Sequence, residues 1–283
     1  MTSATPAVGV PLPPRPSRAT RVGQTLRYYA PAVIAFVAVI ALWELATGAA
    51  PEPRILPPPS AIMAALVENW GAGRWPLFDS ARATLYEAIG GLLLGTAVGL
   101  VVAFAVSRWA SARDSVLPFA IAANAIPIIA IAPIFNAWFG VTNPFSKMMI
   151  VALLVFFPIM INVTRGLTQV EPSALELMRS YAASDWEVLR KVRLPNALPY
   201  FLTALKVATT LSLIGAIVGE YFGGSRVVIG RVVVQSASSL RFDVTWAAIL
   251  LAAVTGIAFY LVVVGLERAL IPWHPSVRGD AVA

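Results

Sequence analysis

The sequence lacks the residues on which most catalytic and metal sites depend. Its 283 residues include no cysteine and a single histidine, His274, which excludes a disulfide framework and a thiolate zinc site. The patterns G-x-x-x-x-G-K-[ST], H-E-x-x-H and G-x-S-x-G are also missing, so there is no Walker-type loop for ATP phosphates and no recognisable hydrolase centre. We therefore predict no catalytic residue, no metal ligand and no cofactor bound by this chain. Energy for any work must come from another polypeptide or from an ion gradient.

Charge is scarce as well. Only 12% of the residues are charged, 58% are hydrophobic, and the mean hydropathy is +0.77. Several apolar runs of about 20 residues are long enough to cross a bilayer as helices, which predicts an all-α membrane protein surrounded by lipid. The net charge of +7 is compatible with nucleic acid, but the basic residues are spread over the loops between apolar runs. We read them as an orientation signal and expect no nucleic-acid partner.

The apolar runs predict six transmembrane helices. Their approximate bounds are 28–47, 84–106, 116–139, 145–163, 200–218 and 244–264. Two short helices are expected between spans, one at 60–70 that Ser60 could cap and one at 230–238.

The chain divides into one membrane domain and two tails. Residues 1–27 are rich in proline, serine and arginine and are predicted to be a disordered cytoplasmic tail. Residues 28–270 are predicted to form the transmembrane domain, and 271–283 a second cytoplasmic tail. A cleaved signal peptide at 21–50 is an alternative, but the apolar run from residue 28 to 46 is long enough to span, and its removal would leave an odd number of spans.

The lysines and arginines orient the spans. With the N-terminus in the cytoplasm, the inner segments carry fourteen of the 21 basic residues and the outer segments carry seven. Because cytoplasmic loops are enriched in these residues, both termini are expected in the cytoplasm.

Residues 171–195 are the one long charged stretch between two apolar runs. Ser173 with Glu176, and Ser184 with Glu187, have the S-x-x-E spacing in which a serine caps a helix and the glutamate reaches back to it. The segment is therefore predicted to form two short helices joined by a turn.

The turn between these helices is expected from Ala182 to Ser184. If Ala182 took a positive φ, the cost would be about 1 kcal/mol, so Ala183 or Ser184 is the alternative position. Pro195 and Pro199 are expected to end the second helix, since proline lacks an N–H and disfavours helix in the residue before it.

The spacing of Glu176, Ala182 and the segment 192–195 follows the signature E-A-A-x-x-x-G-x9-I-x-L-P. By this pattern the chain resembles the permeases of binding-protein-dependent ABC importers. It departs from the signature at Leu177 and Met178, where the family usually has alanine, and at Ala182, where it usually has glycine. The resemblance implies a type I importer-like bundle in the bacterial inner membrane.

In this family the signature loop docks on a cytoplasmic ATPase that holds ATP and magnesium. The resemblance implies a polar contact from Glu176, apolar anchors from Tyr181 and Trp186, and attachment to the fifth span at Leu194 and Pro195. The remaining coupling residues are Ala182, Ala183, Ser184 and Asp185. The other implied partners are an extracytoplasmic solute-binding protein and a second permease copy, as a homodimer.

The segments 176–181 and 191–200 look most like permeases for thiamine-precursor pyrimidines or riboflavin. The element L-P-x-P-S at 56–60 is similar to the wider importer branch for nitrate, sulfonates, taurine and vitamin precursors. A sulfonate, taurine or nitrate permease is therefore the alternative.

Polar residues inside the spans or at their ends are candidates for the translocation path, because polar groups at membrane depth usually face the bundle interior or water. The candidates are Asn124, Asn136, Thr209, Ser212 and Glu220. Hydrogen bonding between helices is the alternative for the two asparagines, and an ion pair with Arg226 is the alternative for Glu220.

Two other classes of protein remain open. An ion-coupled secondary transporter would have ionisable residues near mid-membrane and inverted repeats, and neither is evident in the sequence. A membrane-anchored assembly or signalling protein would not need interrupted, polar-lined spans.

Overall fold

The computed structural model of the protein describes residues 18–48, 55–71, 73–225 and 227–271. All regular elements in these ranges are helical, which confirms the all-α class. Their bounds are α1 Arg18–Gly48, α2 Pro59–Glu68, α3 Leu77–Ser107, α4 Ala110–Ala123, the 3₁₀ turn η1 Ile128–Ile131, α5 Ala132–Phe139, α6 Pro144–Thr168, α7 Pro172–Ser180, α8 Asp185–Val188, the π turn η2 Leu189–Arg193, α9 Leu194–Tyr221, α10 Ile229–Ser238 and α11 Phe242–Leu270.

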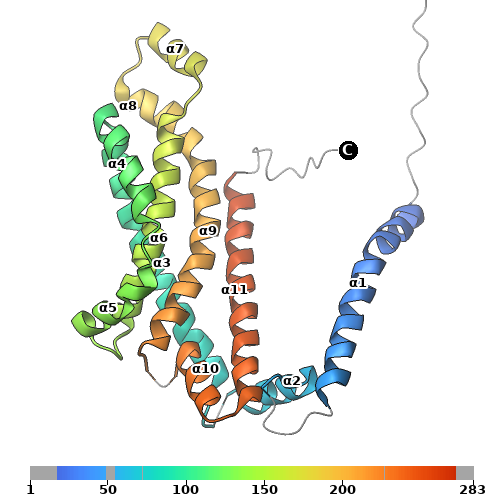
Figure 1. Ribbon diagram of the computed structural model, residues 1–283. Helices are drawn as coiled ribbons and strands as arrows, with labels where there is room; N and C mark the ends of the chain where they lie inside the picture. Colours follow the sequence, from blue (N-terminus) through green and yellow to red (C-terminus); the bar gives the residue numbers. More distant parts are fainter. Residues whose placement is uncertain (1–17, 49–54, 72, 226, 272–283) are drawn as a thin grey trace, which may run out of the picture.

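The bundle places α4, α3, α6, α9 and α11 alongside one another, whereas α1 stands apart and joins the bundle through α2 (Figure 1). The hairpin of α7 and α8 lies at one end, and α5, α10 and α2 lie at the other. The N-terminal end of α1 and the C-terminal end of α11 both lie toward the hairpin end.

Five helices in the described ranges, not six, are long and apolar enough to cross a membrane alone. The third predicted span, 116–139, is broken into α4, η1 and α5. Pro127 and Pro133 explain the break, because each lacks a backbone donor and crowds the turn before it. At 1.5 Å per residue the 14-residue α4 is about 21 Å long, less than a hydrocarbon core.

The first helix also differs from expectation at its start. It begins at Arg18, so residues 18–27 are helical and do not belong to a disordered tail. The rest of that predicted tail, residues 1–17, lies outside the described residues, as does the second tail from residue 272 onward.

The glycines of α3 form a close contact with α6, as their G-x-x-x-G spacing predicts. A Cβ on Gly91 would lie 2.4 Å from the Val151 Cβ, and one on Gly95 would lie 2.5 Å from the Ala152 carbonyl oxygen. These distances leave no room for a side chain. The backbones of α3 and α6 can therefore approach at the centre of the larger core, which α3, α6 and α9 build together.

The start of α2 is stabilised differently from the prediction. Pro58 is the N-cap residue and Ser60 lies in the first turn, where it does not cap the helix itself. Instead, the Ser60 backbone N–H and Oγ donate to the carboxylate of Glu44 on α1, at 3.0 and 2.6 Å. A carboxylate is a strong acceptor and interacts favourably with a helix N-terminus, so Glu44 fixes the elbow between α1 and α2.

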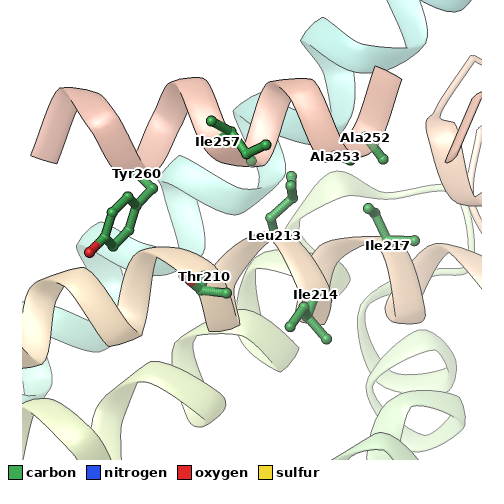
Figure 2. A pocket seen from close by; sticks show the side chains of 9 residues that line it. Thr210, Leu213, Ile214, Ile217, Ala252, Ala253, Ile257 and Tyr260 are labelled. Carbon is green, nitrogen blue, oxygen red and sulfur yellow. The ribbon is translucent and has the colours of Figure 1, made fainter. Parts of the chain in front are cut away.

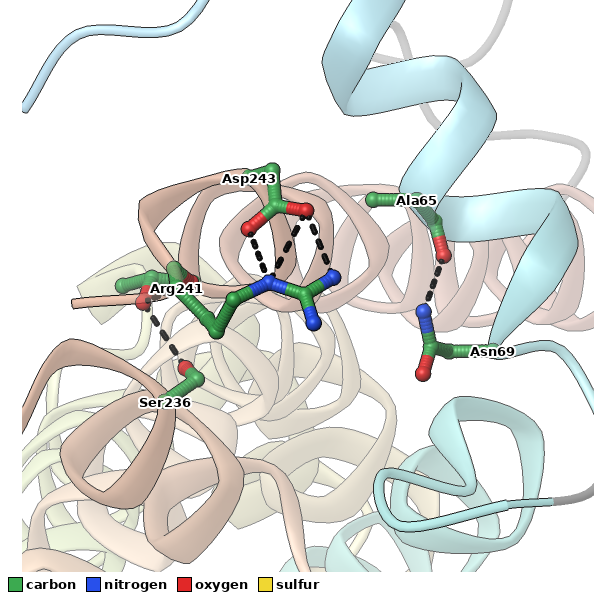
Figure 3. Close-up of polar contacts among 6 residues, drawn as sticks. Ala65, Asn69, Ser236, Arg241 and Asp243 are labelled. Atoms are coloured by element: carbon green, nitrogen blue, oxygen red, sulfur yellow. Dashed lines mark hydrogen bonds and ion pairs between the residues drawn. The ribbon is translucent and has the colours of Figure 1, made fainter. Parts of the chain in front are cut away.

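A tight turn joins α10 to α11 (Figure 3). Leu240 takes a positive φ of 57°, and the Arg241 N–H donates to the Ser236 carbonyl oxygen at 2.9 Å. The Arg241 guanidinium then pairs with Asp243 in the first turn of α11, at 2.8 Å. Nearby, the Asn69 amide closes the end of α2 by donating to the Ala65 carbonyl oxygen at 2.9 Å. Apolar side chains of α2, α10, α11 and the start of α3 form a second, smaller core beside this turn.

Candidate functional site

The segment 171–195 forms a helical hairpin that projects from one end of the bundle (Figure 1). None of the residues of α7, α8 or η2 is buried. Tyr181 is 75% exposed and Trp186 is 65% exposed, and Glu176 is exposed as well. The hairpin therefore presents two large aromatic side chains and a carboxylate on one protruding element.

The first capping box is not formed. Glu171 is the N-cap residue of α7 and Pro172 follows it, so Ser173 falls inside the first turn. The Ser173 hydroxyl donates to the Glu171 carboxylate at 2.8 Å. Glu176 therefore has no capping role, and the described part of the chain gives its carboxylate no hydrogen bond or ion pair.

The second capping box is confirmed. The Ser184 hydroxyl accepts from the Glu187 N–H at 3.4 Å, and the Glu187 carboxylate accepts from the Ser184 N–H at 3.0 Å. Lys191 adds an ion pair with Glu187 at 3.2 Å. The short α8 is thus held at its start by its own side chains.

The turn between the two helices lies at Ala182, and the alternatives Ala183 and Ser184 are wrong. Ala182 has a φ of +49°. The Ala182 N–H donates to the Arg179 carbonyl oxygen at 2.9 Å, and the Ala183 N–H donates to the Met178 carbonyl oxygen at 3.0 Å. This is the pair of bonds of a Schellman motif, in which glycine is preferred at the left-handed residue. The geometry explains why the signature usually has glycine at this position.

Pro195 and Pro199 do not end the second helix, contrary to prediction. The π turn Leu189–Arg193 leads directly into α9, and both prolines lie inside α9. Pro195 is in the first turn of α9, where its missing N–H costs little, and a π turn changes the hydrogen-bond register just before it. The hairpin is consequently continuous with the helix 185–221.

The base of the hairpin is fastened to the bundle. The Asn196 side-chain amide donates to the carbonyl oxygens of Gly166 and Gln169, at 2.7 and 3.1 Å. A Cβ on Gly166 would lie 2.7 Å from the Ala197 Cα, so the ends of α6 and α9 are in close contact here. Movement of the hairpin would therefore be passed to both helices.

A pocket of about 480 Å³ lies between the end of α3 and the second arm of the hairpin. Trp186, Asp185 and Arg193 line it on the hairpin side, and Phe104 and Arg108 line it on the α3 side. Trp186 thus lies at the edge of a pocket with both charged and aromatic walls.

The five candidate path residues are not gathered in one passage. Asn124 is an exposed residue at the end of α4, whereas the other four are buried. The Thr209 and Ser212 hydroxyls donate to carbonyl oxygens of their own helix, at 2.7 and 2.8 Å. Both hydroxyls are buried and hydrogen-bonded within α9, so neither is exposed on a surface that could line a path in the single chain.

Asn136 and Glu220 lie toward the end of the bundle opposite the hairpin. Asn136 accepts from the Ser146 hydroxyl at 2.9 Å, the helix-to-helix bond that was the alternative to path lining. Glu220 accepts from the Gly230 N–H of α10 at 2.6 Å. Its alternative partner, Arg226, lies outside the described residues.

Sequence reasoning missed two buried charges near Glu220. Glu87 is 4% exposed and Lys147 is fully buried, although no ionisable group was expected deep inside a span. Glu87 lies inside the predicted span 84–106, so a carboxylate within an apolar run was a visible signal. Lys147 likewise lies inside a predicted span, 145–163, but its full burial depends on the packing of α6 against α3 and α9.

An apolar pocket of about 450 Å³ opens between α9 and α11 (Figure 2). Its walls are Thr210, Leu213, Ile214 and Ile217 from α9 and Ala252, Ala253, Gly256, Ile257 and Tyr260 from α11. Only the Thr210 and Tyr260 hydroxyls break its apolar lining, so the pocket suits hydrocarbon better than a polar solute.

The sequence pattern described as "Binding-protein-dependent transport system inner membrane component" matches residues 95–273. The chain is 30% identical over 241 residues to the formylaminopyrimidine transport permease protein ThiX of Halalkalibacterium halodurans, covering 84% of this chain and 94% of that protein. It is 27% identical over 260 residues to the riboflavin transport system permease protein RibX of Chloroflexus aurantiacus, covering 90% and 96%. It is 29% identical over 242 residues to the putative aliphatic sulfonates transport permease protein SsuC of Bacillus subtilis, covering 85% and 86%.

Two solved structures share the fold. A chain of the MetNI methionine ABC transporter in an inward-facing conformation superposes with a TM-score of 0.55 and 18% identity, covering 74% of this chain and 97% of that chain. A chain of an amino acid ABC transporter with histidines gives a TM-score of 0.54 and 16% identity, covering 75% and 94%. At these identities the similarity concerns the arrangement of helices alone.

Proposed function

Since the chain belongs to the family of binding-protein-dependent transport system inner membrane components, the permeases of ABC importers, we propose that it moves a small organic solute inward at the expense of ATP hydrolysed by a separate chain. Its helical bundle is of the type I importer class. The ATPase partner would bind ATP and magnesium, and this chain would supply the path and the coupling element.

The exposed hairpin is the observation that carries the coupling proposal. Tyr181 and Trp186 are large, solvent-exposed aromatics, and such residues tend to dominate the energy of small docking surfaces. Glu176 is free of capping bonds and available for a polar contact. All three side chains lie on one protruding hairpin, so a single docking partner could cover them together.

The proposed mechanism uses the rigidity of the hairpin. The Schellman turn at Ala182, the Ser184 capping box and the continuous helix 185–221 make it a lever and not a flexible loop. Closure of the ATPases would shift the hairpin, and the Asn196 contact would carry the shift into α6 and α9. Rocking of the packed helices would then open the path outward, as in a rigid-body transition.

The solute is proposed from the relatives. ThiX is a formylaminopyrimidine permease and RibX a riboflavin permease, which supports a thiamine-precursor pyrimidine or riboflavin as cargo. Aliphatic sulfonates, as for SsuC, are the second candidate.

A second permease copy is proposed as a homodimer partner. Asn124 is an exposed amide at the end of a membrane helix, and an unpaired amide facing lipid would be costly. A second copy, or a water-filled path between the copies, would remove that cost. The hairpin and both termini would lie in the cytoplasm, and the binding protein would dock at the α10 end.

Reconstitution tests the proposal. The chain is purified with its ATPase, inserted into liposomes and supplied with the binding protein and a radiolabelled formylaminopyrimidine, riboflavin or taurine. We expect uptake of one of them that requires ATP, the ATPase and the binding protein together. Uptake driven by a proton or sodium gradient without ATP would overturn the proposal.

A further inference from the structure

Three ionisable side chains are buried close to the start of α10, the short helix at the end of the bundle away from the hairpin (Figure 1). Glu87 of α3 is 4% exposed, and Lys147 of α6 and Glu220 of α9 are fully buried. Glu87 lies one turn after Thr84 on α3. Thr84 and Glu220 accept from neighbouring backbone N–H groups of α10, which brings the two carboxyl groups beside each other. The Lys147 side chain packs against Gly219, next to Glu220. The Lys147 ammonium itself donates to the Val141 carbonyl oxygen.

This cluster holds the start of α10. The Gly230 N–H donates to Glu220 Oε2 at 2.6 Å, and the Ile229 N–H donates to Thr84 Oγ1 at 3.0 Å. A Cβ on residue 230 would lie 2.9 Å from Glu220 Oε2 and 2.5 Å from the Ile217 carbonyl oxygen, so only glycine allows this approach. Side chains from α3 and α9 therefore satisfy two of the free amides at the N-terminus of α10.

The hydrogen bonds indicate which carboxyl group carries charge. A backbone N–H at a helix N-terminus favours the ionised form of its acceptor, which assigns the charge to Glu220. Lys147 balances that charge. An ionised Glu87 would add an unbalanced charge in contact with a second carboxylate, and two carboxylates that share a buried site do not both ionise.

The unpaired oxygens agree with this assignment. Glu87 Oε2 and Glu220 Oε1 are buried and have no hydrogen-bond donor, a costly state for a carboxyl group. One proton on Glu87, directed at Glu220, supplies the missing donor. The other titratable or charged neighbours are Tyr221, next to Glu220 on α9, and Arg231 on α10, whose side chain packs by Gly224.

We propose that Glu87 and Glu220 share one proton, and that this acid pair is a latch that fastens α10 to α3 and α9. Loss of the proton places two carboxylates in contact and weakens the hold of Glu220 on Gly230. The latch then loosens as the pH rises. This inference concerns the chain itself and holds whichever solute is transported.

Infrared spectroscopy tests the shared proton directly in the purified full-length protein. We expect the carbonyl stretch of a protonated carboxyl group at neutral pH, lost in Glu87→Gln and in Glu220→Gln. Glu267→Gln is the matched control and should keep the band, because the buried Glu267 is paired with Lys206. Absence of the band from the unmodified protein, or its survival in both variants, would overturn the proposal.

Cysteine labelling tests the latch, since the chain has no cysteine of its own. Val232→Cys places a thiol on the buried face of α10, and Ser238→Cys places one on its exposed end as the reference for intrinsic reactivity. Normalised labelling of residue 232 should be slow at neutral pH and accelerate at high pH. Glu220→Ala should raise the neutral rate roughly tenfold through loss of a charged hydrogen bond.

Glu87→Gln separates the proton from simple packing. Its amide can still donate to Glu220 but cannot titrate, so labelling should stay slow and lose its pH dependence. Thr84→Val is a milder variant that removes the Ile229 acceptor, and it should accelerate labelling less than Glu220→Ala. A pH-independent rate in the unmodified protein, or an unchanged rate in both Thr84→Val and Glu220→Ala, would sink the latch. Neither experiment uses the ATPase or a solute, so failure here leaves the transport proposal standing, and absence of transport leaves the latch standing.

Discussion

Asn196 donates its side-chain amide to the Gly166 carbonyl oxygen at 2.7 Å, thirty residues away in the sequence. The bond ties the first turn of α9 to the last turns of α6. A second bond from the same amide reaches the Gln169 carbonyl oxygen at 3.1 Å. One side chain thus satisfies two carbonyl groups at the end of α6, at the place where the hairpin leaves the bundle.

Replacing Asn196 with leucine should weaken both stability and coupling. Two carbonyl groups lose their donor, so we expect a loss of about 1–3 kcal/mol in the free energy of unfolding. Thermal unfolding in detergent micelles measures the stability, and stimulation of the ATPase by loaded binding protein measures the coupling. Asn162→Leu is the control, because Asn162 donates only to the Pro158 carbonyl oxygen of its own helix. Equal effects of the two substitutions would show that the bridge between helices has no special role.

The hairpin aromatics should carry the docking energy. Trp186→Ala removes an exposed indole and should reduce co-purification of the ATPase by at least tenfold. Truncating a tryptophan that anchors an interface typically costs about 2 kcal/mol of binding free energy. Glu176→Arg reverses the free carboxylate and should act in the same direction. Trp138→Ala is the matched control, as Trp138 is 71% exposed but lies on α5 at the other end of the bundle. Membrane insertion should be normal in all three, and full ATPase binding by both hairpin variants would contradict the assignment.

Patterns between residues close together in the sequence made much of this architecture predictable. The apolar runs located α3, α6, α9 and α11. The G-x-x-x-G spacing of α3 indicates that another helix packs closely against it, but only the structure identifies that helix as α6. The Ser184 capping box was also visible, because a capping box is closed by residues three positions apart.

Long-range contacts account for what the sequence did not reveal. Ser60 has a capping residue's sequence context, but Glu44 from another helix takes that role. Pro195 was expected to end a helix, but the π turn before it shifts the hydrogen-bond register, and the chain continues into α9 with Pro195 in its first turn. Lys147 lies at the start of a predicted span, and its burial depends on α3 and α9, which pack against α6. In each case the deciding partner lies on another element or in a shifted hydrogen-bond register, and no spacing rule reports it.

Ala182 offers a test of turn strain in the hairpin. Its φ of +49° is a left-handed conformation that costs a residue with a Cβ about 1 kcal/mol relative to glycine. Ala182→Gly should therefore slow proteolysis within the hairpin, whereas Ala182→Val should accelerate it, because a β-branched residue tolerates this conformation worst. The exposed neighbour Ser180→Gly is the control and should not slow cleavage. Faster cleavage of Ala182→Gly would mean that backbone freedom outweighs the relief of strain.

Lys206 and Glu267 join α9 to α11 through an ion pair whose distances are 2.9 Å to both carboxylate oxygens. The side chains are 23% and 7% exposed, so removing one partner leaves a largely buried charge. Lys206→Met should destabilise the protein by about 3–5 kcal/mol, whereas Lys206→Met combined with Glu267→Gln should cost much less. Thermal unfolding of the two single variants and the double variant gives the interaction energy as a double-mutant cycle.

The comparison is the surface pair Lys191 and Glu187, whose side chains are 62% and 45% exposed. Its double-mutant cycle should give an interaction energy of less than about 1 kcal/mol, because solvent screens the two charges. Additive effects at Lys206 and Glu267 would show that the two charges do not stabilise each other.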